Sequence, residues 1–177
     1  SKPQTKFLTS PADIVVYGGA AGGGKTFGLM LDPIRHINVS GFRAVFLRRT
    51  NAEIEKPGGL LEESYNLYGH LSGKLNKNKL MWEFPSGCKI GFDHLQYDST
   101  CMSYRSSQIA ALYFDQLETF TEYQFWYMFS RNRSVSGVKP YIRATANPDP
   151  DSWLRKFIQW WIDDKSGYPI PARDGVL

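Results

Sequence analysis

The stretch DIVVYGGAAGGGKT (residues 13–26) decides the fold of this chain of 177 residues. Residues 13–17 form a short apolar run that ends in glycines, which is typical of a buried strand. From Gly19 the sequence fits the pattern G-x-x-x-x-G-K-[ST], which Lys25 and Thr26 complete. A strand, a glycine-rich turn and a helix in this order predict a loop that binds phosphate groups.

The residue types of this loop suit a nucleoside triphosphate with its metal ion. Glycines let backbone N–H groups wrap closely around phosphate oxygens, and the start of the following helix adds partial positive charge. Lys25 is expected to reach the β- and γ-phosphates, and the Thr26 hydroxyl to ligate Mg²⁺, so we predict ATP and Mg²⁺ as ligands. The alternative is a glycine-rich turn with a solvated lysine, but the pattern arises by chance in under roughly 1% of chains this long. The predicted phosphate-binding residues are Gly19, Ala20, Ala21, Gly22, Gly23, Gly24, Lys25 and Thr26.

The composition is that of one globular domain. Hydrophobic residues make up 42% of the chain and aromatic residues 15%, which excludes a disordered protein. The net charge of +4 permits a nucleic-acid partner but does not require one. Cys88 and Cys101 lack the spacing of metal ligands, and we expect reduced buried thiols, with a disulfide as the alternative. Because no apolar run could span a bilayer and no charged-then-apolar leader opens the chain, a soluble intracellular protein is expected.

Apolar strands alternate with helical segments along the chain. This alternation predicts an α/β fold of the P-loop NTPase class (RecA-like, ASCE), a three-layer sandwich with a mainly parallel central sheet. A β-hairpin is predicted around Pro85-Ser86-Gly87, and we interpret it as an insertion outside the alternation. The predicted strands are residues 13–17, 44–47, 109–114 and 141–146, with 80–84 and 89–92 in the hairpin. The predicted helices are residues 26–37 and 60–71, one that starts near 121, and one from 150 to 162.

Local signals predict how some of these helices begin and end. Pro33 is expected to bend or shorten the first helix. Thr119, with Glu122 three residues on, forms a capping-box pattern before the third helix. Asp149 followed by Pro150 offers an N-cap and a first-turn proline for the last helix.

A phosphate loop of this kind needs a carboxylate from a neighbouring strand to hold the Mg²⁺ shell. Asp115 directly follows the apolar run 109–114 and is the predicted residue, the alternative being an ordinary helix-capping Asp. Hydrolysis also needs a base or water-orienting group, usually a Glu directly after the Asp. Gln116 stands there, and its amide can orient water but cannot accept a proton. Glu118 is therefore predicted to be the catalytic carboxylate, the alternative being a solvated residue near a helix start.

Other polar residues are weaker candidates. Thr145 and Asn147 end the strand 141–146, where polar groups could sense the γ-phosphate; an Asx turn before Pro148 is a compatible reading. Gln4 could bind the adenine edge through its amide, although a lone Gln near an N-terminus is usually only exposed. The candidate transition-state cations, most of them expected to be surface or DNA-facing charges, are Arg48, Arg49, Arg105, Arg131, Arg133 and Arg143.

The chain resembles the ATPase domain of a tailed-bacteriophage terminase large subunit, the DNA-packaging motor. Four blocks carry the resemblance, in the family's order and over nearly the whole chain. They are SPADIVVYGGAAGGGKT (10–26), FPSGCKIGF (84–92), FDQLETFTEYQF (114–125) and SRNRSVSGVKPYIRATANPDPDSW (130–153). Many ATPases share the phosphate loop, whereas its combination with RATANPD (143–149) is much more specific.

The resemblance implies roles for several residues. Gln4 matches the family's adenine-recognition glutamine, and Asp115 matches the Walker B aspartate. Arg105 lies shortly before the Walker B strand, where some terminases place an arginine finger that acts on the neighbouring subunit's ATP. The Walker A motif is matched by Gly19, Gly24, Lys25 and Thr26, and the coupling motif, which links hydrolysis to movement, by Thr145, Ala146 and Asn147.

Two departures from the family pattern affect the catalytic residues. Many terminases carry an arginine inside Walker A, where this chain has Ala21, so an arginine would have to come from elsewhere. Many also have Asp-Glu in Walker B, where this chain has Asp115-Gln116, so the catalytic carboxylate is left open, with Glu118 as the substitute.

The resemblance implies an ATP-hydrolysing motor that drives double-stranded DNA into a procapsid. The implied partners are double-stranded DNA, a small terminase subunit, the portal protein and other copies of the chain in a ring, in the host cytoplasm and transiently at the portal vertex. Residues 1–164 are expected to form the ATPase domain, and residues 165–177 a linker toward a C-terminal nuclease domain that the sequence does not cover, so no DNA cleavage is expected. The alternatives are an ATP-binding assembly module with little hydrolysis, and a helicase-type ATPase, which would need a second RecA-like half.

Overall fold

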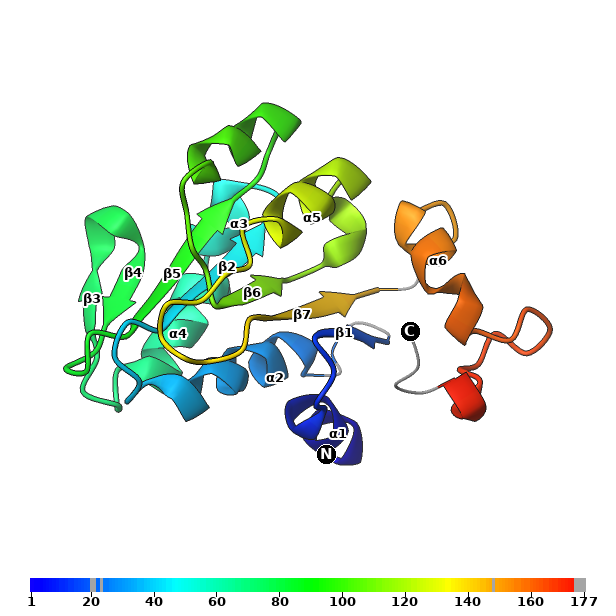
Figure 1. Ribbon diagram of the computed structural model, residues 1–177, viewed down its shortest axis with the longest axis horizontal. Helices are drawn as coiled ribbons and strands as arrows, with labels where there is room; N and C mark the ends of the chain where they lie inside the picture. The colour runs from blue at the N-terminus through cyan, green and yellow to red at the C-terminus, as the bar shows by residue number, and fades with distance from the viewer. Residues whose placement is uncertain (20–21, 23, 148, 174–177) are drawn as a thin grey trace.

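The computed structural model describes residues 1–19, 22, 24–147 and 149–173 (Figure 1). Its central sheet has seven strands in the order β1-β7-β6-β2-β5-β4-β3. The first five strands of that order are mutually parallel, and β4 and β3 continue the sheet in antiparallel pairing. The strands are β1 (Ile14–Gly18), β2 (Arg43–Arg48), β3 (Lys74–Asn76), β4 (Met81–Glu83), β5 (Lys89–His94), β6 (Ala111–Phe114) and β7 (Tyr141–Ala146).

The strand order confirms the predicted fold class. The strand of the phosphate loop, β1, is separated from the aspartate strand, β6, by one strand, β7, as in the ASCE P-loop NTPases. The α-helices are α1 (Lys2–Thr9), α2 (Lys25–Leu31), α3 (Asn51–Glu55), α4 (Leu60–Tyr68), α5 (Glu122–Phe129) and α6 (Trp153–Ile158). Short 3₁₀ turns are η1 (Asp32–His36), η2 (Lys77–Lys79), η3 (Asp98–Tyr104), η4 (Leu117–Thr119), η5 (Gln159–Trp161) and η6 (Pro171–Arg173).

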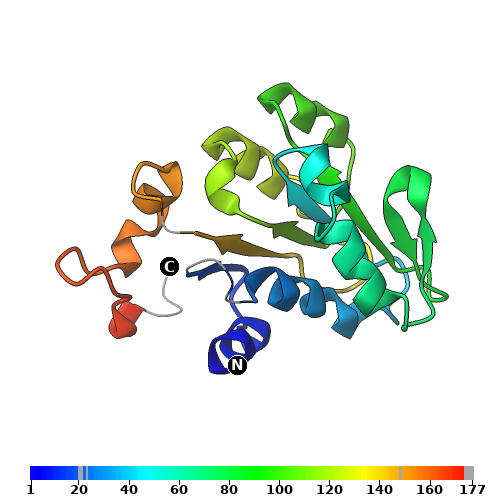
Figure 2. The same cartoon turned by 180° about the vertical axis from the view of Figure 1, so that it is seen from behind.

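Two hydrophobic clusters, one on each face of the sheet, make the three layers. Successive side chains of a strand point to opposite faces, so Phe46 of β2 and Tyr113 of β6 join one cluster while Leu47 and Phe114 join the other. The first cluster packs under α1, α2 and α4, and the second under α5, α6 and η3. Figure 1 shows α2 and α5 on opposite sides of the sheet, and Figure 2 shows α2 and α4 side by side.

A buried hydrogen bond links η1, the turn that follows α2, to the sheet. The Tyr113 hydroxyl lies 2.7 Å from a carboxylate oxygen of Asp32, which begins η1. Burial raises the pKa of Tyr113 well above its ordinary value, so the hydroxyl stays protonated and donates. Cys88 and Cys101 are free and buried, as expected, and burial raises the pKa of each thiol to about 11.

The hairpin prediction is correct in pairing but wrong in placement. β4 and β5 pair antiparallel as predicted, yet β5 also pairs in parallel with β2 along six residues. β5 is therefore part of the parallel central sheet, and β4 and β3 are the strands added to it in antiparallel pairing. Ile90 and Phe92 of β5 are both buried on the α4 side, which explains why this strand is held in the core.

The helix ends differ from their predictions in two places. α5 is capped by Thr121, whose hydroxyl accepts a hydrogen bond from the Gln124 backbone at 3.1 Å, so the pattern at Thr119 is not the cap. α6 begins after Ser152 and not after Asp149, and it ends at Ile158, where η5 follows. As predicted for Pro33, α2 stops at Leu31 and continues as the tighter turn η1.

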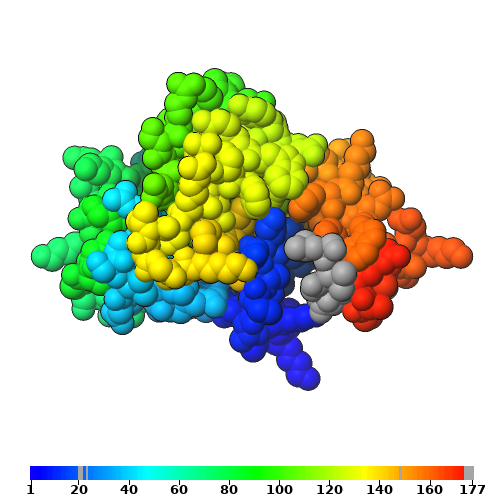
Figure 3. All heavy atoms as spheres, viewed as in Figure 1, coloured from blue at the N-terminus to red at the C-terminus, as the bar shows by residue number. Residues whose placement is uncertain are grey.

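The segment after β7 forms a lobe at one end of the molecule, away from the β3–β4 end (Figure 3). Ile162 and Pro169 make an isolated antiparallel bridge, and the Arg173 guanidinium lies 4.9 Å from the centre of the Trp160 ring. Residues 165–173, predicted as a linker, therefore turn back onto the end of α6 and η5. Among the described helices, none is long and apolar enough to cross a membrane.

Candidate nucleotide-binding site

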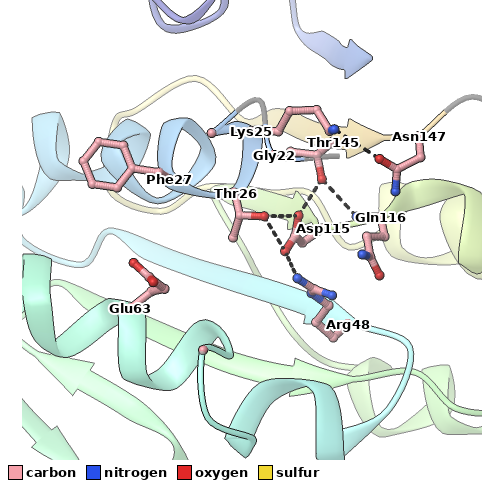
Figure 4. A pocket seen from close by; sticks show the side chains of 12 residues that line it. Gly22, Lys25, Thr26, Phe27, Arg48, Glu63, Asp115, Gln116, Thr145 and Asn147 are labelled. Carbon is pink, nitrogen blue, oxygen red and sulfur yellow. Dashed lines mark hydrogen bonds and ion pairs between the residues drawn. The ribbon is translucent and has the colours of Figure 1, made fainter. Parts of the chain in front are cut away.

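The carboxyl ends of the parallel strands meet at one edge of the sheet, and a cleft lies there. Ligands of open α/β sheets bind at this edge because the loops that leave the strands converge there. The cleft has a volume of about 310 Å³. Its lining comes from the phosphate loop and the start of α2, from the ends of β2, β6 and β7, and from the start of α4 (Figure 4). The described lining residues are Gly22, Gly24, Lys25, Thr26, Phe27, Arg48, Gly58, Glu63, Asp115, Gln116, Thr145 and Asn147.

The phosphate loop begins at the end of β1 and leads directly into α2. Gly24 caps α2 with a φ of 65°, in the left-handed region that glycine adopts without strain. A Cβ at this position would also lie 2.8 Å from the amide nitrogen of Gln4. Lys25 folds back over the loop, where its Nζ donates to the Gly19 carbonyl at 2.7 Å. The loop predictions at Ala20, Ala21 and Gly23 fall outside the described residues.

Asp115 lies at the centre of the cleft floor with 1% of its surface exposed. The Thr26 hydroxyl donates to its carboxylate at 3.1 and 3.2 Å, and the Thr145 hydroxyl donates at 2.5 Å. Arg48, at the end of β2, places Nη2 2.5 Å from Oδ2 of the same carboxylate. Thr26 therefore approaches Asp115 from α2, Thr145 from β7 and Arg48 from β2 (Figure 4).

This donor set fits the predicted magnesium ion. A carboxylate and a hydroxyl oxygen lie side by side on the wall of the cleft, and hard oxygen ligands are what Mg²⁺ prefers. In this arrangement Thr26 and Asp115 would hold the ion, which would neutralise charge on the bound phosphates. Among the described residues, no cluster of three or more His, Cys, Asp or Glu side chains forms an all-protein metal cage.

The chain turns sharply directly after Asp115. Gln116 adopts a left-handed conformation, with φ 65° and ψ 61°, and its side chain lines the cleft. Its backbone N–H donates to the Thr145 hydroxyl at 3.0 Å, so one threonine holds both Asp115 and the turn. The turn η4 then carries Glu118 away from the cleft lining, to a position behind Asn147.

Asn147 connects the phosphate loop to Glu118. Its Oδ1 accepts a hydrogen bond from Lys25 at 3.1 Å, and its Nδ2 donates to Oε1 of Glu118 at 2.8 Å. The second carboxylate oxygen of Glu118 is buried without a hydrogen-bond partner among the described residues. The side chain of Asn147 thus bridges Glu118, the predicted catalytic carboxylate, and Lys25, the predicted phosphate-binding lysine.

The sequence matches the family described as "Terminase large subunit, T4likevirus-type, N-terminal" over residues 16–174. The chain belongs to this family. The match confirms the resemblance that the four sequence blocks carry. A search of the curated proteins found no match to the sequence.

Solved terminase structures share the fold at low sequence identity. The chain is similar to a large terminase from a thermophilic bacteriophage, with a TM-score of 0.66 and 16% identity over 89% of this chain and 41% of that one. It is similar to the N-terminal domain of the DNA packaging ATPase of bacteriophage phi29, with a TM-score of 0.65 and 13% identity over 90% of this chain and 86% of that one. It is also similar to the Thermus phage P74-26 large terminase ATPase domain, with a TM-score of 0.62 and 12% identity over 92% of this chain and 70% of that one. The chain thus spans about two fifths of the length of the first of these three proteins.

Gln4, the predicted adenine-recognition residue of this terminase chain, lies on α1 beside the phosphate loop. Its Nε2 donates to the Gly24 carbonyl at 3.0 Å. Phe7, on the same helix, stacks on Tyr17 of β1 with ring centres 5.3 Å apart, which holds α1 against the loop strand. Sequence patterns do not predict α1, because this short and mostly polar segment buries only Phe7.

Arg105, the predicted arginine finger of the terminase chain, is not a lining residue of this cleft. It caps the end of η3, its side chain is exposed, and its backbone carbonyl accepts a hydrogen bond from Arg131 at 2.6 Å. Arg48 was only one of six candidate cations in the sequence, yet it is the arginine that lines the cleft. Its position at the end of a buried strand, like that of Asp115, was the signal that could have singled it out.

Glu63 is a cleft residue that the sequence did not indicate. It lies on α4, and its carboxylate points toward α2 at the outer end of the cleft (Figure 4). Nothing in its local sequence separates it from the neighbouring Glu62, which instead accepts a hydrogen bond from the Gly58 backbone at 2.6 Å. Only the packing of α4 beside α2 brings Glu63 to the cleft.

Proposed function

We propose that this terminase domain binds ATP with Mg²⁺ in the cleft and hydrolyses it to drive double-stranded DNA into a procapsid. The observation that carries the proposal is the convergence of Lys25, Thr26 and Asp115 at one strand edge, next to a glycine loop at a helix N-terminus. Structures of the similar thermophilic-bacteriophage large terminase in complex with ADP and with ATP-gamma-S support a nucleotide as the ligand.

Each residue has a distinct role in the proposed reaction. Lys25 binds the β- and γ-phosphates, and Thr26 and Asp115 hold the magnesium ion. Gln4 recognises the adenine edge from α1, beside the loop. Thr145 and Asn147 report the state of the nucleotide, because they contact Asp115 and Lys25 from the end of β7. The backbone N–H groups of the glycine loop, from Gly19 to Gly24, cradle the phosphates.

Glu118 is proposed as the carboxylate that activates the attacking water. Its contact with Asn147 supports this role, since Lys25 and Glu118 hold the two ends of one amide. When Lys25 turns to a phosphate it leaves Oδ1 of Asn147, which frees that amide to rotate and Glu118 to approach the cleft. Gln116, which already lines the cleft, orients the water without accepting its proton.

Arg105 is proposed to act on the nucleotide of a neighbouring copy in a ring on the portal. Its exposed position outside this cleft supports an action between subunits. The further partners proposed for the assembled motor are double-stranded DNA, the portal protein and a small terminase subunit, because the chain belongs to the terminase large-subunit family.

The competing function is an ATP-binding assembly module with little hydrolysis. It is favoured by one observation, that the amide of Gln116 lines the cleft where a carboxylate is usual, while Glu118 does not. The two functions differ in phosphate release by the wild-type chain with Mg²⁺, DNA and portal present. Sustained release supports the motor, whereas tight ATP binding without release identifies the assembly module.

Three variants with matched controls test the residue roles. Lys25→Ala is expected to abolish nucleotide binding, while the exposed Lys56→Ala leaves it unchanged. Glu118→Gln is expected to lower phosphate release at least 100-fold with binding retained, against Glu122→Gln on α5 as its control. Full turnover by Glu118→Gln would show that another group activates the water. If Arg105 acts on a neighbouring copy, turnover should rise with protein concentration, and Arg105→Ala should reduce it under those conditions. The exposed Arg133→Ala is the control and should leave turnover unchanged.

A further inference from the structure

Arg48 enters the cleft from the strand opposite the phosphate loop. Its side chain is 12% exposed, and Nη2 lies 2.5 Å from Oδ2 of Asp115. The Thr26 hydroxyl lies 3.2 Å from the same Oδ2, so the guanidinium and the hydroxyl face each other across one carboxylate oxygen. Thr26 is a proposed magnesium-binding residue, and that ion bridges the β- and γ-phosphates in P-loop enzymes. Arg48 therefore lies beside the proposed position of the terminal phosphate.

Within the described part of the chain, most N–H donors of this guanidinium have no partner. Arginine carries five N–H donors in a planar fork that suits phosphate oxygens. Among the described residues, Asp115 is the partner of the Arg48 side chain, and the Nε of Arg48 is buried without one. A buried unpaired donor costs free energy that an incoming phosphate oxygen would recover.

Asp115 keeps other partners if Arg48 leaves it. The hydroxyls of Thr26 and Thr145 both donate to its carboxylate. A magnesium ion held by Thr26 and Asp115 would place a second positive charge at the same carboxylate. Like charges repel, so such an ion would weaken the attraction between Asp115 and Arg48, and a negative phosphate beside the guanidinium would then be the stronger partner.

We propose that Arg48 is a γ-phosphate-binding residue that exchanges Asp115 for the terminal phosphate of ATP. It supplies, from the same chain, the arginine that many terminases carry inside the loop, where this sequence has Ala21. The proposal rests on the proposed function, because it requires ATP and Mg²⁺ in this cleft. The rival role is purely structural: Arg48 would only neutralise Asp115, whichever nucleotide is bound.

The test compares equilibrium binding of ADP and of a non-hydrolysable ATP analogue, each with Mg²⁺, by titration calorimetry. Arg48→Ala is expected to weaken binding of the analogue about tenfold or more, since it removes charge-assisted hydrogen bonds, and that of ADP less than about threefold. Arg48→Lys should fall between, because it keeps the charge but loses the fork. The control is Arg49→Ala, which removes the next side chain, bonded at 2.6 Å to Gln124 and outside the cleft lining.

The outcomes separate the two proposals. Equal weakening of both nucleotides by Arg48→Ala, or none, overturns the role of Arg48 while ATP binding stands. If the wild type binds neither nucleotide, or Lys25→Ala binds both as well as the wild type, the proposed function fails and this inference fails with it. If Arg48→Ala does not fold, the ratio of the two affinities in Arg48→Lys decides, and a ratio equal to that of the wild type overturns the proposal.

Discussion

Thr145 is the residue whose removal most directly tests how the site is held together. Its hydroxyl donates to Oδ1 of Asp115 at 2.5 Å and accepts from the backbone N–H of Gln116 at 3.0 Å. Thr145 is 1% exposed, so water can replace neither contact without a local opening. Thr145→Val keeps the shape of the side chain and removes only the hydroxyl, so it isolates the two hydrogen bonds.

The expected loss of stability follows from these two contacts. A hydrogen bond to a charged group contributes about 1.5–3 kcal/mol, and a buried donor left unpaired costs about 1–3 kcal/mol. Because the turn at Gln116 is only partly buried, we take the lower part of the second range. Thr145→Val should therefore lower the free energy of unfolding by about 3 kcal/mol. For a domain of this size that corresponds to a fall in Tm of about 6–12 °C.

Urea unfolding of the nucleotide-free chain, followed by circular dichroism and tryptophan fluorescence, measures this loss. Thr145→Ser is the matched control, since it keeps the hydroxyl and loses one buried methyl group, at a cost of about 1 kcal/mol. The reasoning is refuted if Thr145→Val unfolds within about 0.5 kcal/mol of the wild type. Thr145→Ser should stay within about 1 kcal/mol of the wild type, because it retains both hydrogen bonds and loses only the methyl group.

Two further predictions concern the strained turn and the thiols. Gln116→Gly should raise the free energy of unfolding by about 0.5–1 kcal/mol, because glycine adopts the left-handed conformation without strain, and should slow phosphate release, because the amide in the cleft is lost. Gln116→Ala, which keeps the strain, is the control, and equal stability of the two variants in urea unfolding would contradict the prediction. Cys88 and Cys101, whose pKa values are raised to about 11, should react with iodoacetamide at pH 8 far more slowly in the native chain than in urea. Equal labelling rates by mass spectrometry would show that the thiols are accessible in the native state.

The features that the sequence predicts best are those that depend on neighbouring residues. The strand, the glycine loop and the helix of residues 13–37 follow from local composition, and so does the break at Pro33. The position of Asp115 at the end of a buried strand follows from local composition in the same way. Local composition does not fix the start of α5, because two overlapping capping patterns, at Thr119 and at Thr121, lie within three residues of each other. Only the packing of α5 against the sheet selects the second.

The features that the sequence does not predict depend on which strands are neighbours. β5 reads as half of a hairpin, and its pairing with β2 joins segments about 45 residues apart. Arg48 cannot be told from the other arginines until β2 is known to lie beside β6, which brings it to Asp115. Glu63 likewise needs the contact between α2 and α4. Long-range pairing is decided by the summed burial of many side chains, which no short pattern records.

Asp115 is attached to three separate elements at this edge of the sheet, because its partners Thr26, Thr145 and Arg48 lie on α2, β7 and β2 respectively. Any splaying of the sheet at this edge must lengthen at least one of these contacts, so the carboxylate is sensitive to mechanical load. If a nucleotide draws Arg48 away, it also removes a tie between the ends of β2 and β6. By thermodynamic reciprocity, a force that pulls those ends apart then favours the nucleotide-bound arrangement. Tension transmitted through β2 would shift the balance from the arrangement in which Arg48 pairs with Asp115 to the one in which Arg48 binds the phosphate.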